Sequence, residues 1–303
     1  MKGGDALNKT VAVITPTYNR AHLLSELYDS LLNQSCFDFV WYIVDDGSTD
    51  NTEELCRGFK TDKFRIEYLR KENGGKHTAL NVGIARIEAP LTFIVDSDDS
   101  LTPDAIYTIV RDWDGFKDDP EIAGISYYKL HKDGRVVGDE YPGAEIIGTY
   151  LDVRVNQNIM GDKAEVYRTD VLKTFKFPVF EGERFLSEAV VWSAISRAGY
   201  KLVYLSKGIY VCEYLNGGLT ASGRKYRLQN PFGTMEHAKA FLCNEVKLIL
   251  RAKYMLLYIA TSFFAPVSLR ETFEKIDNLK WLYVLEFIPG WLLSKYWKRK
   301  FKL

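Results

Sequence analysis

Short apolar runs alternate with stretches of helical periodicity over the first 110 residues. Four runs rich in β-branched and aromatic residues are typical of buried strands; they cover residues 11–14, 39–44, 64–69 and 91–95. After the first run, Leu24, Leu27 and Leu31 recur at helical spacing. Strands that alternate with helices predict a parallel sheet with helices on both faces.

A polar cluster follows each predicted strand. The four clusters are Thr15-Pro16-Thr17-Tyr18-Asn19-Arg20, Asp45-Asp46-Gly47-Ser48-Thr49-Asp50, Asn73-Gly74-Gly75-Lys76 and Asp96-Ser97-Asp98-Asp99. In open α/β sheets, ligands bind at the carboxyl ends of the parallel strands. The clusters therefore predict a binding site along one rim of the sheet.

The last cluster is the richest in carboxylates. Because the chain turns here, Asp96 and Asp98 can converge on one point. Two such oxygen ligands suit a divalent cation that also holds the phosphates of a substrate. A turn that caps the helix starting near Pro103 is an ordinary alternative, since Asp and Ser dominate turns and N-caps.

The four clusters together, with Asn81, resemble family 2 glycosyltransferases in order and spacing. The resemblance is dense over residues 10–112 and looser to about residue 223. It implies an α/β GT-A fold with a mixed, mostly parallel central sheet, a nucleotide-diphosphate sugar as donor, and transfer with inversion at the anomeric carbon. Four ordered motifs are far more specific than a single Asp-x-Asp.

The resemblance also implies roles for individual residues at the donor site. The expected donor residues are Thr15, Tyr18, Asp46, Lys76 and Asp96, and the expected ligands of Mn²⁺ or Mg²⁺ are Asp98 and Asp96. Asp46 would accept a hydrogen bond from a uracil ring N–H, although turn formation is its alternative role. Lys76 would reach the base or a phosphate, or be a solvated lysine in a Gly-rich turn. UDP is the expected nucleotide, and GDP or dTDP sugars fit the same frame.

An inverting transfer needs a general base that removes the proton of the acceptor hydroxyl. The resemblance places this base at an Asp or Glu that opens a helix in the second half, often within a Glu-Asp pair. Ala189 follows Glu188 here, so that pair is missing. We rank Glu188 first, Glu183 second and Asp162 third. A first-turn glutamate that complements the helix dipole is the structural alternative for Glu188.

Composition narrows the remaining possibilities. The chain has 303 residues, and its 40 basic residues balance its 40 acidic ones, so no nucleic-acid partner is expected. Four cysteines without a metal or disulfide pattern suit a reducing compartment. The polar start Met1-Lys2-Gly3-Gly4-Asp5 predicts no signal peptide. These features predict a cytoplasmic location, either free or peripheral at the inner face of the cell membrane.

The chain divides by character near residue 225. We expect a GT-A catalytic domain over residues 1–225, with a nucleotide-sugar half (10–112) and an acceptor half (113–225), and a helical extension over 226–303. The segment 215–223 is either a loop that closes over the donor or a plain connection. Aromatic and basic residues interleave over 279–303, which resembles an anchor for an anionic membrane surface with Trp291 and Trp297 at headgroup depth. A packed amphipathic helix pair with a solvated tail is the alternative.

The sequence therefore predicts a metal-assisted glycosyltransferase that acts on a glycan acceptor, lipid-linked in one version of the hypothesis, in cell-surface polysaccharide biosynthesis. Two other classes stay open. A sugar nucleotidyltransferase would need a Gly-rich phosphate loop after the first strand, and residues 15–19 contain no glycine. A non-catalytic nucleotide-sugar-binding protein would explain Ala189 as the mark of a lost base.

Overall fold

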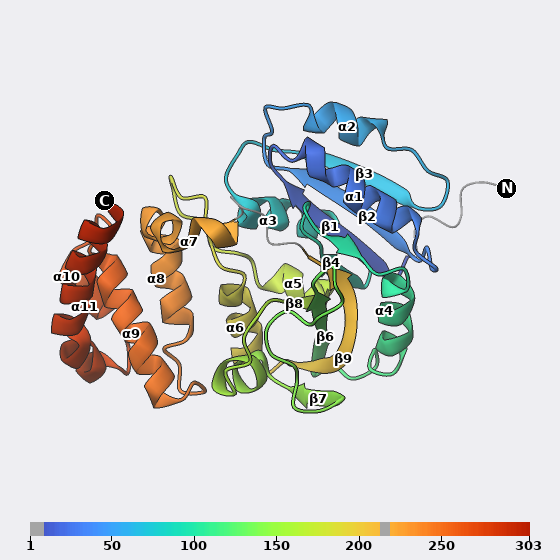
Figure 1. Ribbon diagram of the computed structural model, residues 1–303. Coiled ribbons are helices and arrows are strands. Elements are labelled where there is room, and N and C mark those ends of the chain that lie inside the picture. Colours follow the sequence, from blue (N-terminus) through green and yellow to red (C-terminus); the bar gives the residue numbers. More distant parts are fainter. Residues whose placement is uncertain (1–8, 213–218) are drawn as a thin grey trace.

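A computed structural model describes residues 9–212 and 219–303, with the backbone alone for 219–222. The polar start of the chain and residues 215–218 of the segment predicted as a closing loop, 215–223, lie outside the described residues. Figure 1 shows two regions: an α/β part around a twisted sheet, and a stack of helices that ends at the C-terminus.

The alternation predicted for the first 110 residues is confirmed. The parallel strands are β1 (Val11–Thr17), β2 (Phe39–Asp45), β3 (Arg65–Arg70) and β4 (Leu91–Ile94). The helices between and after them are α1 (Ala21–Leu32), α2 (Thr52–Gly58), α3 (Lys76–Arg86) and α4 (Ala105–Asp114). Every residue of β1 and β2 is buried, as expected for strands covered on both faces.

The second half of the α/β part adds antiparallel pairs to the sheet. Its elements are β5 (Ser100–Leu101), β6 (Ile122–Leu130), β7 (Glu145–Gly148), the π-helical turn η1 (Leu151–Asn156), β8 (Lys163–Arg168), α5 (Thr169–Thr174), α6 (Ala189–Arg197) and β9 (Lys201–Val211). The described strands form one nine-stranded sheet in the order β3-β2-β1-β4-β8-β6-β9-β5, with β7 paired to β9. β8 runs antiparallel to both β4 and β6, so the sheet is mixed.

Two apolar cores lie on opposite faces of this sheet. Leu24, Leu27 and Leu31 of α1 pack with Val11 and Val13 of β1 on one face, where α4 also contributes. On the other face α3, α5 and α6 cover the alternate strand residues, such as Ala12 and Ile14 of β1. Because β1 pairs in parallel with both β2 and β4, the carboxyl ends of the three strands lie at one edge of the sheet.

The helical region contains α7 (Leu219–Gln229), α8 (Pro231–Ala240), α9 (Leu248–Ser262), α10 (Leu269–Glu274) and α11 (Lys280–Phe301). α8 packs against α6 and α9, and α11 packs along α9. Gly290 allows the close approach of α11, because a Cβ there would lie 2.6 Å from Cγ2 of Ile259. Among the described residues, no helix combines the length and apolar character needed to cross a membrane.

Candidate active site

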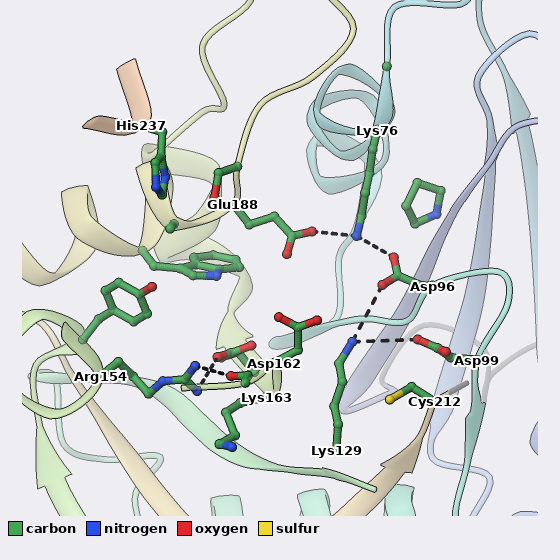
Figure 2. A pocket seen from close by; sticks show the side chains of 18 of the residues that line it. Lys76, Asp96, Asp99, Lys129, Arg154, Asp162, Lys163, Glu188, Cys212 and His237 are labelled. Atoms are coloured by element: carbon green, nitrogen blue, oxygen red, sulfur yellow. Dashed lines mark hydrogen bonds and ion pairs between the residues drawn. The ribbon is translucent and has the colours of Figure 1, made fainter. Parts of the chain in front are cut away.

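A cavity of about 940 Å³ opens at the carboxyl edge of the parallel strands. It extends from this edge across the second half of the sheet to the helical region. Its lining includes Tyr18, Asp46, Lys76, Asp96, Asp98, Lys129, Arg154, Asp162, Glu188, His237 and Tyr254. Side chains from widely separated parts of the sequence therefore face one space (Figure 2).

Two lysines surround Asp96 at the end of β4. Lys76 Nζ lies 2.5 Å from one carboxylate oxygen of Asp96, and Lys129 Nζ lies 3.7 Å from the other. Lys129 also lies 3.8 Å from Asp99 and 4.0 Å from the centre of the Tyr210 ring. The Tyr210 hydroxyl donates to Asp99 at 2.7 Å and accepts from the backbone N–H of Asp96 at 2.9 Å. These contacts fix the turn that carries the aspartates.

The same contacts separate the pKa values of the two carboxyl groups. Burial alone would raise the pKa of Asp96, but the charges of Lys76 and Lys129 lower it to about 2. Burial and the negative charge of Asp96 raise the pKa of Asp99 to about 7. Asp96 is therefore an anion at neutral pH, whereas Asp99 is close to its midpoint.

Asp98 lies apart from this lysine network. Its carboxylate pairs with Arg20 at 3.1 Å, and about a quarter of its side chain is exposed. Among the described residues, no group of three or more His, Cys, Asp or Glu side chains is arranged to hold a metal ion. The carboxylates of Asp98 and Asp96 instead suit a divalent cation that takes one or two protein ligands and completes its shell with substrate phosphate and water.

Gly75 allows the loop before α3, at the carboxyl edge of the parallel strands, to contact the second half of the chain. Its φ of +93° lies in the left-handed region, and a Cβ there would meet the backbone oxygen of Arg184 at 2.2 Å. Only glycine fits this contact without movement of the backbone. Lys76, the first residue of α3, follows directly and reaches across the cavity.

Of three residues expected at the nucleotide, Asp46 and Thr15 have their polar atoms occupied by protein contacts, whereas Tyr18 is exposed. Asp46 lines the cavity, but one oxygen accepts from Gly75 N–H at 2.6 Å and the other accepts from Lys71 Nζ at 2.7 Å. Thr15 is fully buried and is absent from the cavity lining, because its hydroxyl turns inward to accept from the Trp41 indole N–H at 3.0 Å. Tyr18 presents a 41% exposed ring to the cavity.

Glu188 stands directly before α6 and faces the cavity. Its carboxylate lies 2.9 Å from Lys76 Nζ, and about a third of its side chain is exposed. Lys76 thus contacts one carboxylate from each half of the chain, Asp96 and Glu188. Burial alone would lower the pKa of Lys76, yet these two carboxylates raise it, so the lysine stays charged.

The two other candidate bases have different surroundings. Glu183 does not line the cavity; its two carboxylate oxygens accept from the backbone N–H groups of Phe232 and Gly233, each at 2.7 Å, at the start of α8. Asp162 is exposed and lines the cavity near Arg154, as Figure 2 shows. The structure therefore brings Glu188 and Asp162 to the cavity and uses Glu183 as a helix cap.

Several cavity residues were not identified from the sequence. Lys129 lies near the end of the buried strand β6, and a charge at such a position is a usable signal. No local sequence pattern marks Arg154 on η1 or His237 on α8, because only tertiary packing brings these elements to the cavity. Arg20 was part of a recognised cluster but without an assigned role.

Two solved structures share this fold. S. aureus TarS residues 1–349 in complex with UDP-GlcNAc align with a TM-score of 0.65 and 18% identity, over 96% of this chain and 92% of that one. The mannosyltransferase PcManGT from Pyrobaculum calidifontis, in complex with GDP-Man and Mn²⁺, aligns with a TM-score of 0.57 and 17% identity, over 95% of this chain and 88% of that one. At these identities the likeness shows the fold, which is that of the GT-A class.

Sequence relatives give the family. Residues 12–176 match the model of Glycosyl transferase family 2, and the chain belongs to that family. Glycosyltransferase GlyA from Streptococcus pneumoniae serotype 4 is 27% identical over 230 residues, which is 69% of this chain and 31% of GlyA. The chain thus spans about a third of the length of that relative.

Proposed function

We propose that this glycosyltransferase moves a sugar from a UDP-sugar to a hydroxyl group of a glycan acceptor, with inversion and with the help of Mn²⁺ or Mg²⁺, in cell-surface polysaccharide synthesis. The observation that carries this proposal is the ion-pair bridge from Asp96 through Lys76 to Glu188. The bridge supports the proposal because the base would then be Glu188 on one wall of the cavity, and the diphosphate would bind near Asp96 on the other.

Glu188 is the proposed general base. It would take the proton of the acceptor hydroxyl while that oxygen bonds to the anomeric carbon, and the bond from this carbon to the diphosphate oxygen breaks on the opposite side. The products are the elongated glycan and UDP. Attack and departure on opposite faces invert the anomeric configuration, which fits a base and a leaving-group site on facing walls.

Asp98, with Asp96 beside it, is the proposed metal site. Asp98 fits this role because its carboxylate is partly exposed to the cavity and has a single ion-pair partner among the described residues. A bound divalent cation would supply positive charge to the diphosphate that leaves. Lys76 and Lys129 keep Asp96 ionised and so preserve its ability to accept ribose hydroxyls or a cation. Tyr18 would stack its exposed ring against the nucleobase.

The expected nucleotide is UDP, and two observations bear on this choice. The structural neighbour TarS binds UDP-GlcNAc, whereas PcManGT binds GDP-Man. Asp46 was expected to receive the uracil ring N–H, but its oxygens already accept from Gly74, Gly75 and Lys71. We therefore propose that Asp46 shapes the nucleobase pocket by holding the Gly74-Gly75 backbone. A direct hydrogen bond from the nucleobase would go to an Asp46 oxygen that already accepts another hydrogen bond.

We also propose that α11 contacts an anionic membrane at the inner face of the cell membrane. Its exposed large apolar residues lie three or four positions apart, on one face of the helix; they are Trp281, Val284, Leu285, Ile288, Trp291, Leu292 and Tyr296. Residues 279–303 carry six basic side chains and one acidic one. An apolar face beside a basic end favours anionic lipid.

Trp297 does not belong to this face. It was expected at headgroup depth with Trp291, but it is 6% exposed and packs with Leu228 and Ala260. The Arg224 guanidinium lies 4.6 Å from the centre of its ring. The inner face of α11 is therefore a packed helix, and the proposed membrane contact is limited to its outer face.

The experiment that tests the proposed activity measures nucleotide release and ligand-induced stabilisation. Purified protein, with and without Mn²⁺, is incubated with UDP, GDP, dTDP and their sugars, and the released nucleotide and the melting temperature are recorded. A ligand that binds only the folded state raises the melting temperature by mass action. We expect UDP and its sugars to stabilise the protein only when a divalent cation is present. Equal stabilisation by every nucleotide, or none, would contradict the proposal.

A further inference from the structure

The cavity continues beyond Glu188 into a recess formed by η1, α6 and α8. Figure 2 shows His237 and Arg154 on one side of Glu188, and Lys76 and Asp96 on the other. All five residues line the same cavity. If the donor diphosphate lies on the Asp96 side of Glu188, the recess lies on the opposite side of Glu188, where the acceptor would bind.

Buried polar atoms without a hydrogen-bond partner mark this recess. In the part of the chain that the structure describes, Nε and Nη1 of Arg154 and Nδ1 of His237 are buried and form no hydrogen bond. The remaining nitrogen of the guanidinium, Nη2, donates to the backbone oxygen of Gly161 at 2.5 Å. Because buried polar groups are nearly always paired in native proteins, these atoms call for a polar ligand or ordered water.

His237 has the properties of a neutral hydrogen-bonding group. Burial lowers its pKa to about 4, and the charge of Arg227 adds to this effect. At neutral pH one ring nitrogen therefore donates and the other accepts, which matches a hydroxyl group. Phe241 and Tyr254 hold the ring edge-on, with centroids 5.1 and 5.9 Å from that of His237.

The charges around the recess give no preference for an anionic ligand. The Arg154 guanidinium already faces the carboxylate of Glu165 at 3.9 Å, and the exposed carboxylate of Asp162 lines the same wall. The Lys163 ammonium is turned away onto the backbone oxygens of Val137 and Asp139. The exposed Lys253 adds a second positive charge to the lining, and burial raises the pKa of Glu165 to about 7. Positive and negative groups therefore balance around the recess, so an acceptor phosphate or carboxylate would meet no surplus of positive charge.

We propose that this recess binds the receiving sugar of the acceptor, and that this sugar is an uncharged pyranose whose hydroxyl groups are held by Arg154 and His237 next to Glu188. The inference rests on the proposed glycosyl transfer and names the chemical class of its acceptor. Hydroxyl groups both donate and accept, so they can satisfy the guanidinium, the imidazole and the nearby carboxylates together. The helix α8, from the C-terminal extension, then contributes directly to acceptor recognition.

The experiment compares matched acceptors with the full-length protein, Mn²⁺ and the nucleotide sugar that the enzyme hydrolyses. The acceptors are methyl β-D-glucoside and methyl β-D-galactoside, each beside its uronic acid counterpart, which differs by a carboxylate at C6. The variants are His237→Gln and Arg154→Met, and the control is His22→Gln, an exposed histidine in α1. Donor hydrolysis without acceptor is measured in parallel as a readout of the donor site alone.

We expect transfer to at least one glycoside and at least tenfold less to its uronic acid. His237→Gln should raise the KM for the acceptor by roughly three- to tenfold, the loss of one neutral hydrogen bond. The donor KM and donor hydrolysis should stay near wild type, and His22→Gln should change nothing. Arg154→Met should show the same split; because Arg154 is buried, its melting temperature is checked first, and His237→Gln carries the test alone if Arg154→Met unfolds.

Three results would overturn the inference. They are preference for a uronic acid over its glycoside, an unchanged acceptor KM in His237→Gln, and no transfer to either glycoside while donor hydrolysis persists. Loss of donor hydrolysis in the wild type with every nucleotide sugar is a different result, because it would contradict the proposed glycosyl transfer itself. The donor-side readout therefore separates failure of the acceptor recess from failure of the activity.

Discussion

Glu188→Gln is the sharpest test of the proposed chemistry. Glutamine has nearly the same size as glutamate but cannot take a proton from the acceptor. Turnover should fall by ~10²–10⁴, the usual contribution of a general base. This loss corresponds to about 3–5 kcal/mol of transition-state stabilisation. Because donor contacts lie on the other side of Lys76, donor binding should survive.

The structure predicts only a small cost in stability for the same change. The Glu188 side chain is about a third exposed and forms a 2.9 Å ion pair with Lys76. After the substitution Lys76 would still have Asp96 as a partner. Partly exposed ion pairs contribute at most ~1 kcal/mol. The melting temperature of a 303-residue chain should therefore fall by no more than ~2–4 °C.

Glu183→Gln provides a matched control only five residues away. Each of its carboxylate oxygens accepts a backbone N–H from the start of α8 at 2.7 Å. A glutamine amide would leave one of these donors unpaired, at a cost of ~1–3 kcal/mol. We therefore expect Glu183→Gln to lower the melting temperature while the folded fraction keeps near-normal turnover, the reverse of Glu188→Gln.

The assay follows UDP release with and without acceptor, beside thermal unfolding of both variants. Near-normal turnover in Glu188→Gln would remove this residue from the mechanism and direct attention to Asp162, which also faces the cavity. Turnover loss in Glu183→Gln without loss of stability would refute the assignment of Glu183 as a helix cap.

Three further predictions concern the metal, the glycine contact and the membrane. Asp98→Asn should keep the fold but abolish Mn²⁺-dependent UDP binding in calorimetry; unchanged binding would exclude Asp98 as a ligand. Gly75→Ala should cost ~1–3 kcal/mol in urea unfolding and more than Gly134→Ala, because both have positive φ but only Gly75 meets backbone. The full chain should bind anionic vesicles at low salt with ~1 kcal/mol from each basic residue near the surface, whereas a chain ending at Asn278 should not; binding to neutral vesicles, or salt-independent binding, would contradict the anchor.

The donor edge could be predicted from sequence because its determinants are local. An apolar run predicts a buried strand, and the polar cluster that follows it predicts a binding site at the strand's carboxyl end. This pattern occurs four times before residue 110. The placement of Asp96, Asp98, Tyr18 and Lys76 around one cavity follows from that repetition. Thr15 shows the limit of the argument, because the hydroxyl of a strand residue can turn either to the rim or to a neighbour such as Trp41.

The second half could not be predicted to the same depth, because long-range contacts decide it. The sequence ranks Glu188 above Glu183, but it does not show that Glu183 binds the start of α8, about fifty residues later. A similar ambiguity affected Trp291 and Trp297, which share a Trp-rich segment but lie on different faces of α11. Helical spacing alone does not tell which face meets α9.

The cavity combines side chains from three segments that differ in sequence character. The nucleotide half supplies Asp96 and Lys76, the second half supplies Glu188, and the helical extension supplies His237. Gly75 locks the first two together through its contact with Arg184, and Glu183 ties the second to α8. The boundary proposed near residue 225 is therefore not a boundary of the cavity, because His237 of α8 lies beyond it and still lines the cavity together with Glu188.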